Sequence, residues 1–193
     1  MDKAARAGRI RAEALGVFAA KGYSATALAE IASAAGITRT SLYEHFASKR
    51  ELYMAVLREQ TEAAVAYVST RVTGDGTPEQ RMRAAVDAYF AYAETNPAAA
   101  RLLFDRSREG DPELRELRRE VRDGGIEVAR VLLTADLAAV GIDPEPPNGW
   151  AAVEVIVSAL DGGIRWWDRH PSTPRADLVD AVIATLKGGF APA

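Results

Sequence analysis

The stretch that decides the fold is GYSATALAEIASAAGITRTSLYEHFASKRELYMAV, residues 22–56. It holds two short helix-forming runs, 27–35 and 38–45, separated by the turn at Gly36-Ile37. Glycine is expected directly after a helix because it readily adopts the left-handed conformation that ends one. Apolar residues in and between the two runs supply a compact core: Leu28, Ile31, Ile37, Leu42 and Phe46. The pattern predicts a helix-turn-helix that packs against a first helix over 3–21.

Helix start signals divide the rest of the chain in the same way. Four dipeptides place a capping residue before a proline that suits the first helical turn: Thr77-Pro78, Asn96-Pro97, Asp111-Pro112 and Thr173-Pro174. Glycines at 22, 36 and 141 are the expected stops. The predicted helices are 3–21, 27–35, 38–45, 48–72, 78–95, 97–109, 112–140, 149–169 and 174–188. Strand signals are nearly absent, so the predicted fold class is all-α. We expect a three-helix helix-turn-helix domain over 1–47 and a larger C-terminal helical domain over 48–193.

Composition narrows the classes of protein. The chain has 193 residues, of which 48% are hydrophobic, so a sizeable core is expected. It has no cysteine, which excludes disulfides, thiolate metal sites and a cysteine nucleophile, and fits a reducing cytoplasm. No signal peptide and no run of about 18 apolar residues can be read, so a cytoplasmic protein without a membrane span is expected.

Charge is distributed unevenly along the chain. Residues 1–58 hold nine basic and five acidic residues, a net charge of +4, whereas the whole chain carries −3. A basic head on an acidic body favours contact between the head and a polyanion. Chance placement of charges on solvated faces explains the same numbers equally well.

The predicted helix 38–45 carries the polar residues best suited to hydrogen bonding. Its expected outward residues are Thr38, Arg39, Thr40, Ser41, Glu44 and His45, with Tyr43 at an edge. A forked guanidinium suits guanine, short hydroxyls approach base edges, and tyrosine and histidine donate to phosphate. Ser48 is expected to cap the next helix, where Lys49 stands at the first turn. A helix N-terminus with a lysine in its first turn predicts a phosphate-binding site.

Residues 22–56 resemble the N-terminal DNA-binding domain of the tetracycline-repressor (TetR) family. The spacing is unbroken over about 35 residues, and the matching pieces are Gly22-Tyr23, Thr26, Ile31-Ala32, Ala35-Gly36, Leu42-Tyr43, His45-Phe46, Lys49 and Leu52. The resemblance implies that the third helix enters the major groove and that Tyr43, His45 and Lys49 grip the phosphate backbone. It also implies a phosphate contact for Thr26 and base reading by Arg39, Thr40 and Ser41, while Thr38 is a further candidate DNA-binding residue.

Two positions depart from the family pattern. Ala27 stands where Thr or Ser is common, which removes one expected backbone contact. Thr40 stands where glycine is common, which changes the closest approach to a base. Glu44 is an acid beside the expected phosphates, and it either turns away or accepts from a cytosine amino group.

The resemblance also assigns roles to the C-terminal helices. The fifth to eighth helices form the ligand cavity in this family, which makes Phe90, Phe104 and Trp150 the candidate lining residues for an unknown small-molecule effector. That these rings simply fill a packed core stays open. The last two helices carry sustained apolar stripes, and in the family they pair across a two-fold axis. The expected dimer interface is Leu160, Gly163, Trp167, Leu178, Val182 and Leu186.

The prediction is therefore a homodimeric DNA-binding transcription regulator, a ligand-responsive repressor that reads a palindromic double-stranded DNA operator. No catalytic constellation, metal site or cofactor is expected, so the chain is not predicted to be an enzyme. Two alternatives remain. One is a helical small-molecule carrier or enzyme with a degenerate head, and the other is a DNA-binding adaptor controlled by a protein partner.

Overall fold

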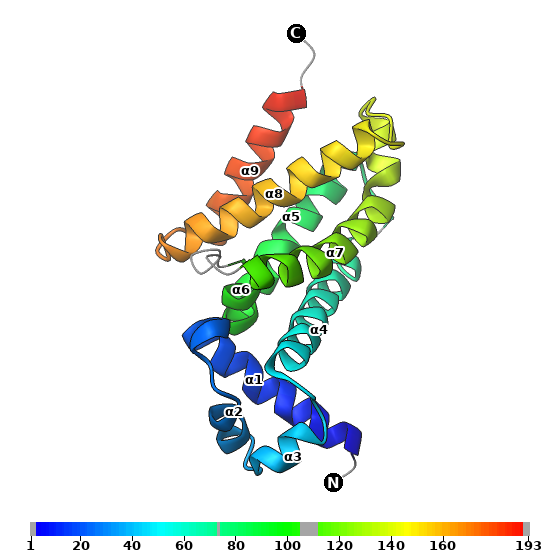
Figure 1. Cartoon of the computed structure of the whole chain (residues 1–193). Helices are drawn as coiled ribbons and strands as arrows, with labels where there is room; N and C mark the ends of the chain where they lie inside the picture. Colours follow the sequence, from blue (N-terminus) through cyan, green and yellow to red (C-terminus); the bar gives the residue numbers. More distant parts are fainter. Residues whose placement is uncertain (1–2, 73, 105–111, 191–193) are drawn as a thin grey trace. The chain divides into compact units, whose positions relative to one another are not determined.

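The computed structural model describes residues 3–72, 74–104 and 112–190, and every regular element in those ranges is a helix (Figure 1). The helices are α1 (Lys3–Ala25), α2 (Leu28–Ala34), α3 (Arg39–Tyr43), α4 (Lys49–Ser69), α5 (Pro78–Thr95), α6 (Pro97–Phe104), α7 (Pro112–Ala139), α8 (Asn148–Asp168) and α9 (Arg175–Phe190). The predicted all-α class is confirmed. The third helix is shorter than the predicted 38–45, and residues 105–109 of the predicted sixth helix lie outside the described residues.

Local chemistry explains where the helices begin and end. The three glycines expected as stops all have left-handed backbone, with φ of 77° at Gly22, 65° at Gly36 and 81° at Gly141. Gly22 interrupts the helical backbone inside α1, so the regular part of that helix ends near its predicted limit. At the start of α5, Thr77 accepts a hydrogen bond from the Gln80 amide at 3.2 Å while the Gln80 side chain accepts one from the Thr77 amide at 2.8 Å. This reciprocal capping box satisfies two backbone amides at the start of α5, where the sequence predicted Thr77 as the capping residue.

The chain forms two compact units. The first comprises residues 1–61 and 97–121, and the second comprises residues 62–96 and 122–193. The helices α4 and α7 contribute to both. The sequence-based division into domains over 1–47 and 48–193 stays a prediction.

In the first unit, α1, α2 and α3 enclose one apolar core together with the start of α4 and with α6 and α7. Ile10 of α1, Ile31 of α2 and Leu42 of α3 are fully buried, and Phe46 is 6% exposed. The ring of Phe18 meets the ring of Tyr53 edge-on at 4.9 Å between centroids, which fixes α1 against α4. α6 also packs along α1. This core holds α3 rigidly, so its exposed face is presented in one orientation.

In the second unit, α5 packs against both α8 and α9. Phe90 of α5 is fully buried, and a Cβ atom added to Gly163 of α8 would lie 2.9 Å from its ring. Glycine at 163 therefore lets α8 lie directly on the Phe90 ring. Near the other end of α5, Arg81 pairs with Asp136 of α7, and Asp136 is 7% exposed.

Candidate nucleic-acid interface

The helix α3 is anchored by one face and exposed on the other. Leu42 is fully buried, while Arg39 and Thr40 are exposed and Ser41 is half-buried. Thr38 caps the helix, since its hydroxyl oxygen accepts from the Ser41 amide at 3.1 Å. A hydroxyl that accepts one bond still has its proton to donate, so the cap leaves Thr38 able to bind a phosphate oxygen. The structure thus brings the three candidate base-reading residues, Arg39, Thr40 and Ser41, together on one short helix that Thr38 caps.

The residues after α3 extend this polar surface. Tyr43 is 46% exposed and is one of the large hydrophobic side chains that the core leaves outside. His45 is half-buried and Glu44 is exposed. Ser48 caps α4 as expected, because its Oγ accepts from the Glu51 amide at 3.1 Å, and the Glu51 carboxylate accepts from the Ala47 amide at 2.6 Å. These two backbone amides at the start of α4 therefore have hydrogen-bond acceptors within the chain.

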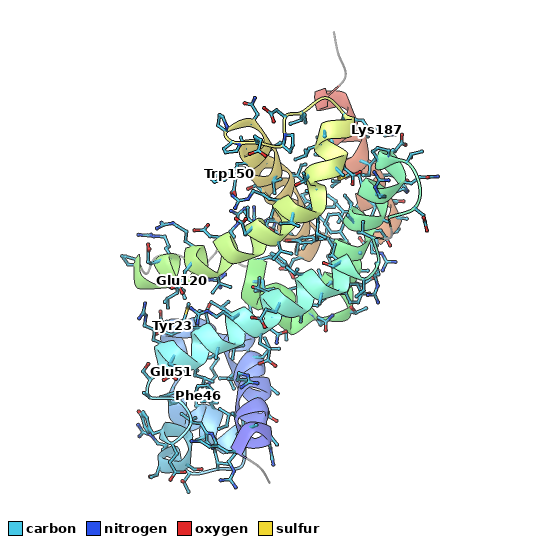
Figure 2. All side chains as sticks on the ribbon, turned by 90° about the vertical axis from the view of Figure 1, so that its right-hand side faces the viewer. Tyr23, Phe46, Glu51, Glu120, Trp150 and Lys187 are labelled. Atoms are coloured by element: carbon cyan, nitrogen blue, oxygen red, sulfur yellow. The ribbon has the colours of Figure 1, made fainter. Side chains whose placement is uncertain are left out.

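Lys49 has contacts that sequence reasoning missed. Its Nζ donates to the backbone oxygens of Tyr23 at 2.9 Å, Thr26 at 3.0 Å and Ser24 at 3.4 Å. It also lies 4.6 Å from the centroid of the Tyr23 ring, which Figure 2 labels. Lys49 therefore connects the end of α1 and the residue that follows it to the start of α4. A lysine 23 to 26 residues beyond its acceptors gives no local sequence signal for such a contact.

Thr26 also lies differently from a simple phosphate ligand. It is 3% exposed, and its hydroxyl donates to the backbone oxygen of Gly22 at 2.6 Å. The hydroxyl proton is thus used inside the chain, next to the left-handed glycine that ends α1. The phosphate contact of Thr26 stays a prediction, and in this conformation its side chain stabilises the turn into α2.

The start of α2 shows how the chain accommodates Ala27. Alanine has no side-chain acceptor, and the Glu30 carboxylate instead accepts from the Ala27 amide at 3.3 Å. Glu30 also pairs with Lys21 of α1 at 2.6 Å. The bond to Lys21, followed by the bond to the Ala27 amide, lowers the pKa of Glu30. The ion pair therefore connects α1 and α2 where a threonine or serine cap is missing.

The three candidate ligand residues belong to different units of the chain. Phe90 is buried in the second unit, where it lies against Gly163 and where its ring centroid is 6.1 Å from that of Trp167. Phe104 belongs to the first unit and is 9% exposed. Trp150 of α8 (Figure 2) is 49% exposed, and the guanidinium of Arg130 lies 4.1 Å from its ring centroid. A ligand role for these residues stays a prediction, and Phe90 is a packed core side chain in this structure.

The candidate dimer residues are divided between the interior and the surface. Leu160 and Leu178 are 7% and 6% exposed within the second unit, and Gly163 faces Phe90. Trp167 is half-buried and its Nε1 donates to the Thr173 backbone oxygen at 2.8 Å, while Val182 and Leu186 are half-buried.

The large apolar side chains that α8 does expose, besides Trp150, are Val155 at 59% and Trp166 at 40%. Sequence reasoning missed them because α8 is apolar on more than one face, so periodicity alone cannot say which face the chain covers.

No three His, Asp or Glu side chains in the described ranges are grouped so that they could hold a metal ion. None of the described helices is both long and apolar enough to cross a membrane.

Comparison with known proteins gives a consistent result. Residues 10–56 match the model of the family described as bacterial regulatory proteins, tetR family. The chain is 32% identical over 185 residues to the HTH-type transcriptional activator FasR of Mycolicibacterium smegmatis, covering 96% of this chain and 83% of that protein.

Solved structures agree with the fold. The fatty acid degradation regulator FadR from Bacillus halodurans has a TM-score of 0.83 and 22% identity, and the alignment covers 100% of both chains. FadR from Bacillus subtilis, solved in complex with stearoyl-CoA, has a TM-score of 0.78 and 19% identity over 93% of this chain and 96% of that one. The exposed face of α3, the family match and the nearly full-length relative together show that the chain belongs to the tetR family of bacterial DNA-binding transcription regulators.

Proposed function

We propose that the chain acts as a homodimer, reads a roughly palindromic operator with α3, and changes its operator affinity when a small molecule binds its C-terminal helices. The observation that carries the DNA-reading part is the division of α3 into a buried side at Leu42 and an exposed side at Arg39 and Thr40. A rigidly seated helix with an exposed guanidinium and hydroxyls suits the major groove, where arginine donates twice to guanine. We assign phosphate contacts to Tyr43, His45, Lys49 and Thr26, and base-edge contacts to the exposed start of the helix.

Lys49 is proposed to have two roles. Its ammonium has three protons, and in this structure they face the backbone oxygens of Tyr23, Ser24 and Thr26. We propose that it binds phosphate through its charge while it keeps at least part of this hydrogen bonding. The charge then serves both the turn and the DNA backbone.

A dimer is proposed because one operator half-site is read by one α3. Two recognition helices must lie about 34–36 Å apart to enter successive major grooves on one face of DNA. The surface proposed for pairing is the exposed side of α8 with Val155 and Trp166, together with the half-buried Val182 and Leu186 of α9. The apolar side chains exposed on α8 and half-buried on α9, two helices that pack on each other, support this assignment.

The effector class proposed for first testing is a long-chain acyl compound. One protein of the same fold is named a fatty acid degradation regulator, and another was solved in complex with stearoyl-CoA. An effector acts only through its different affinity for the two states of the dimer, and a coupling of about 1–3 kcal/mol changes operator affinity roughly 5–150-fold.

The proposed sign of regulation is repression, since occupying promoter DNA is enough to exclude RNA polymerase. The relative from M. smegmatis is named an activator, so a promoter reporter with and without the protein is the measurement that decides the sign. We propose the cytoplasm as the location of this activity, because the bacterial chromosome lies there.

The central test is selection of genomic fragments by the purified full chain, followed by fluorescence anisotropy on the selected duplex. We expect a sequence with two related half-sites and an affinity that falls steeply as salt rises. Equal affinity for selected and random DNA would contradict operator reading. Retained operator binding with no response to any small molecule would favour the adaptor controlled by a protein partner, and absence of DNA binding would favour the carrier or enzyme.

A further inference from the structure

Four ionisable side chains meet in the second unit, and the proposed DNA reading uses none of them. Tyr89 of α5 donates its hydroxyl to Oδ1 of Asp161 of α8 at 2.6 Å. Nε of Arg122 of α7 lies 3.5 Å from Oδ2 of the same carboxylate, and Asp161 is 6% exposed. Arg165, one turn further along α8, is near enough for its charge to act on Tyr89. We call these four residues the Asp161 cluster.

The arginines of the Asp161 cluster have unused hydrogen-bond donors. Nε of Arg122 and Nη1 of Arg165 are shielded from solvent and have no hydrogen-bond partner among the described residues. A buried donor without an acceptor costs free energy, so such groups in a native protein call for an explanation such as a missing ligand. Arg165 also lacks an acid partner, since the structure shows no carboxylate of the described residues in an ion pair with it.

The two arginines differ in what holds them. Arg122 contacts Glu154 and donates from Nη2 to the Ser158 hydroxyl at 3.0 Å. Burial by itself lowers the pKa of Arg122, but its contacts with Glu154 and Asp161 outweigh burial and raise that pKa overall. Hydrogen bonds and ion pairs therefore hold the side chain of Arg122 in place, whereas the side chain of Arg165 has no comparable set of partners.

Charge in the cluster is shared unevenly between the two arginines. Burial raises the pKa of Tyr89 well above its ordinary value, and the charge of Asp161 adds to this, so the phenol stays neutral. Asp161 and Glu154 both pair with Arg122, so neither carboxylate is paired with the half-buried Arg165. An additional anionic group near Arg165 would pair with its charge and complete its hydrogen bonding.

The surroundings of the cluster are apolar. Phe90 follows Tyr89 on α5 and is fully buried, and Ile164 precedes Arg165 on α8 and is 6% exposed. Trp167 packs edge-on against the Phe90 ring. Gly162 lies next to the guanidinium of Arg165 and has no side chain. A Cβ atom added there would lie 3.7 Å from Nη2 of Arg165, which is an ordinary contact distance. A molecule that joins an anionic head to an apolar body matches this arrangement.

We propose that the effector carries a carboxylate, and that Arg165 binds this carboxylate with Arg122 as the supporting cation. The proposal rests on the ligand response proposed above and names the chemical class and the residue that recognises it. A guanidinium donates two parallel bonds to a carboxylate, which a lysine or an uncharged donor does not reproduce. Binding would require α8 side chains to rearrange around the Phe90 and Trp167 rings.

The test compares three probes on the full chain: dodecanoic acid, dodecanol and dodecanoyl-CoA, each below its micelle concentration. Tryptophan fluorescence and thermal unfolding report binding to wild type, Arg165→Met, Arg165→Lys and the matched control Arg169→Met. Arg169 is exposed one turn beyond Arg165 and makes no contact with the cluster among those observed. We expect the acid to bind wild type and Arg169→Met, and Arg165→Met to weaken that binding about tenfold or more.

The unliganded variants separate recognition from structure. Since Nη1 of Arg165 has no partner, Arg165→Met should leave the unliganded Tm unchanged or raise it. Equal binding of acid and alcohol, preference for the CoA ester, undiminished binding to Arg165→Met, or absence of binding by all three probes would overturn the carboxylate assignment. If Arg165→Met fails to fold, Arg165→Lys supplies the same comparison, since it keeps the charge and loses the forked geometry.

Operator anisotropy separates this proposal from the ligand response on which it rests. Acid that binds through Arg165 without changing operator affinity contradicts the ligand response and leaves the carboxylate site standing. A different small molecule that releases DNA equally from wild type and Arg165→Met contradicts the carboxylate site and leaves the ligand response standing.

Discussion

The ammonium of Lys49 lies 2.9 Å from the backbone oxygen of Tyr23 and 4.6 Å from the centroid of the ring of the same residue. One side chain at the start of α4 thus holds the end of α1. Tyr23 in turn packs on Tyr53 at 4.9 Å between ring centroids, so the contact continues into the core of the first unit. A residue expected to bind phosphate therefore also supports the geometry of the helix-turn-helix.

The first prediction concerns the two roles of Lys49. Lys49→Met should lower the free energy of unfolding by about 1–3 kcal/mol, because three backbone oxygens lose a charged donor. It should also weaken binding to all DNA sequences about equally and reduce the salt slope by about 1. Urea unfolding and anisotropy at several salt concentrations measure the two effects. A salt slope identical to wild type would remove Lys49 from the phosphate contacts and leave only its structural role.

The second prediction concerns base reading by Arg39. Arg39 is exposed on α3, and its side chain makes no hydrogen bond or ion pair within the described part of the chain. Arg39→Ala should cost about 1–3 kcal/mol at one base pair per half-site and relax the preference there. Binding to a panel of single-base operator variants measures this. An equal loss on operator and random duplex would mean that Arg39 contacts only phosphate.

The third prediction distinguishes surface from core on α8. Val155 is 59% exposed, whereas Leu160 is 7% exposed. Val155→Glu should leave a folded chain and shift sedimentation from dimer to monomer at micromolar concentration, while Leu160→Glu should unfold the second unit because it buries a charge. Substitution of the half-buried Val182 or Leu186 by a charged residue should dissociate the dimer or unfold the protein. A folded wild-type monomer at micromolar concentration would contradict the dimer.

The fourth prediction concerns whether the rings of Phe90 and Phe104 fill a packed core or line a ligand cavity. Phe90→Ala and Phe104→Ala should each cost about 3–5 kcal/mol if these rings fill a packed core. Gly163→Ala should cost about 1–3 kcal/mol, because its new methyl group meets the Phe90 ring. The double variant Phe90→Leu with Gly163→Ala should be more stable than the sum of the single effects indicates, since a smaller side chain makes room for the methyl. Strict additivity would contradict the close contact. A small loss for Phe104→Ala together with a blunted effector response would support a ligand role for that residue.

The fifth prediction concerns pH and the Lys21–Glu30 pair. The folded-state pKa of Glu30 is lowered by Lys21 and the Ala27 amide, so its stabilising effect is present above the pKa of the unfolded chain. That effect is lost as pH falls through the lowered folded-state pKa. The difference in urea midpoint between wild type and Glu30→Gln should therefore be largest near neutral pH and shrink in acid. A difference that stays constant from pH 7 down to pH 3 would contradict this linkage.

The sequence by itself determined the helices and the turn between α2 and α3. Glycine at 22, 36 and 141, proline after a capping residue, and the Thr77–Gln80 box are local signals, and each acts within four residues of where it stands. The buried set Ile31, Leu42 and Phe46 was also readable, because apolar spacing at helical period fixes which side of a short helix faces inward. Recognition of the family and the exposed polar face of α3 followed from the same local stretch.

Only the tertiary structure decided which long-range partners these residues meet. Lys49 reaches acceptors 23 to 26 residues away, and Tyr89 reaches Asp161 across 72 residues, so neither contact leaves a periodic signal. The structure also decided that Gly163 lies on Phe90 and that Val155 and Trp166 are the exposed residues of α8. A helix that is apolar on more than one face has no preferred buried side until a neighbour covers one of them. In the second unit that neighbour is α5, and its Phe90 ring determines which side of α8 is left exposed.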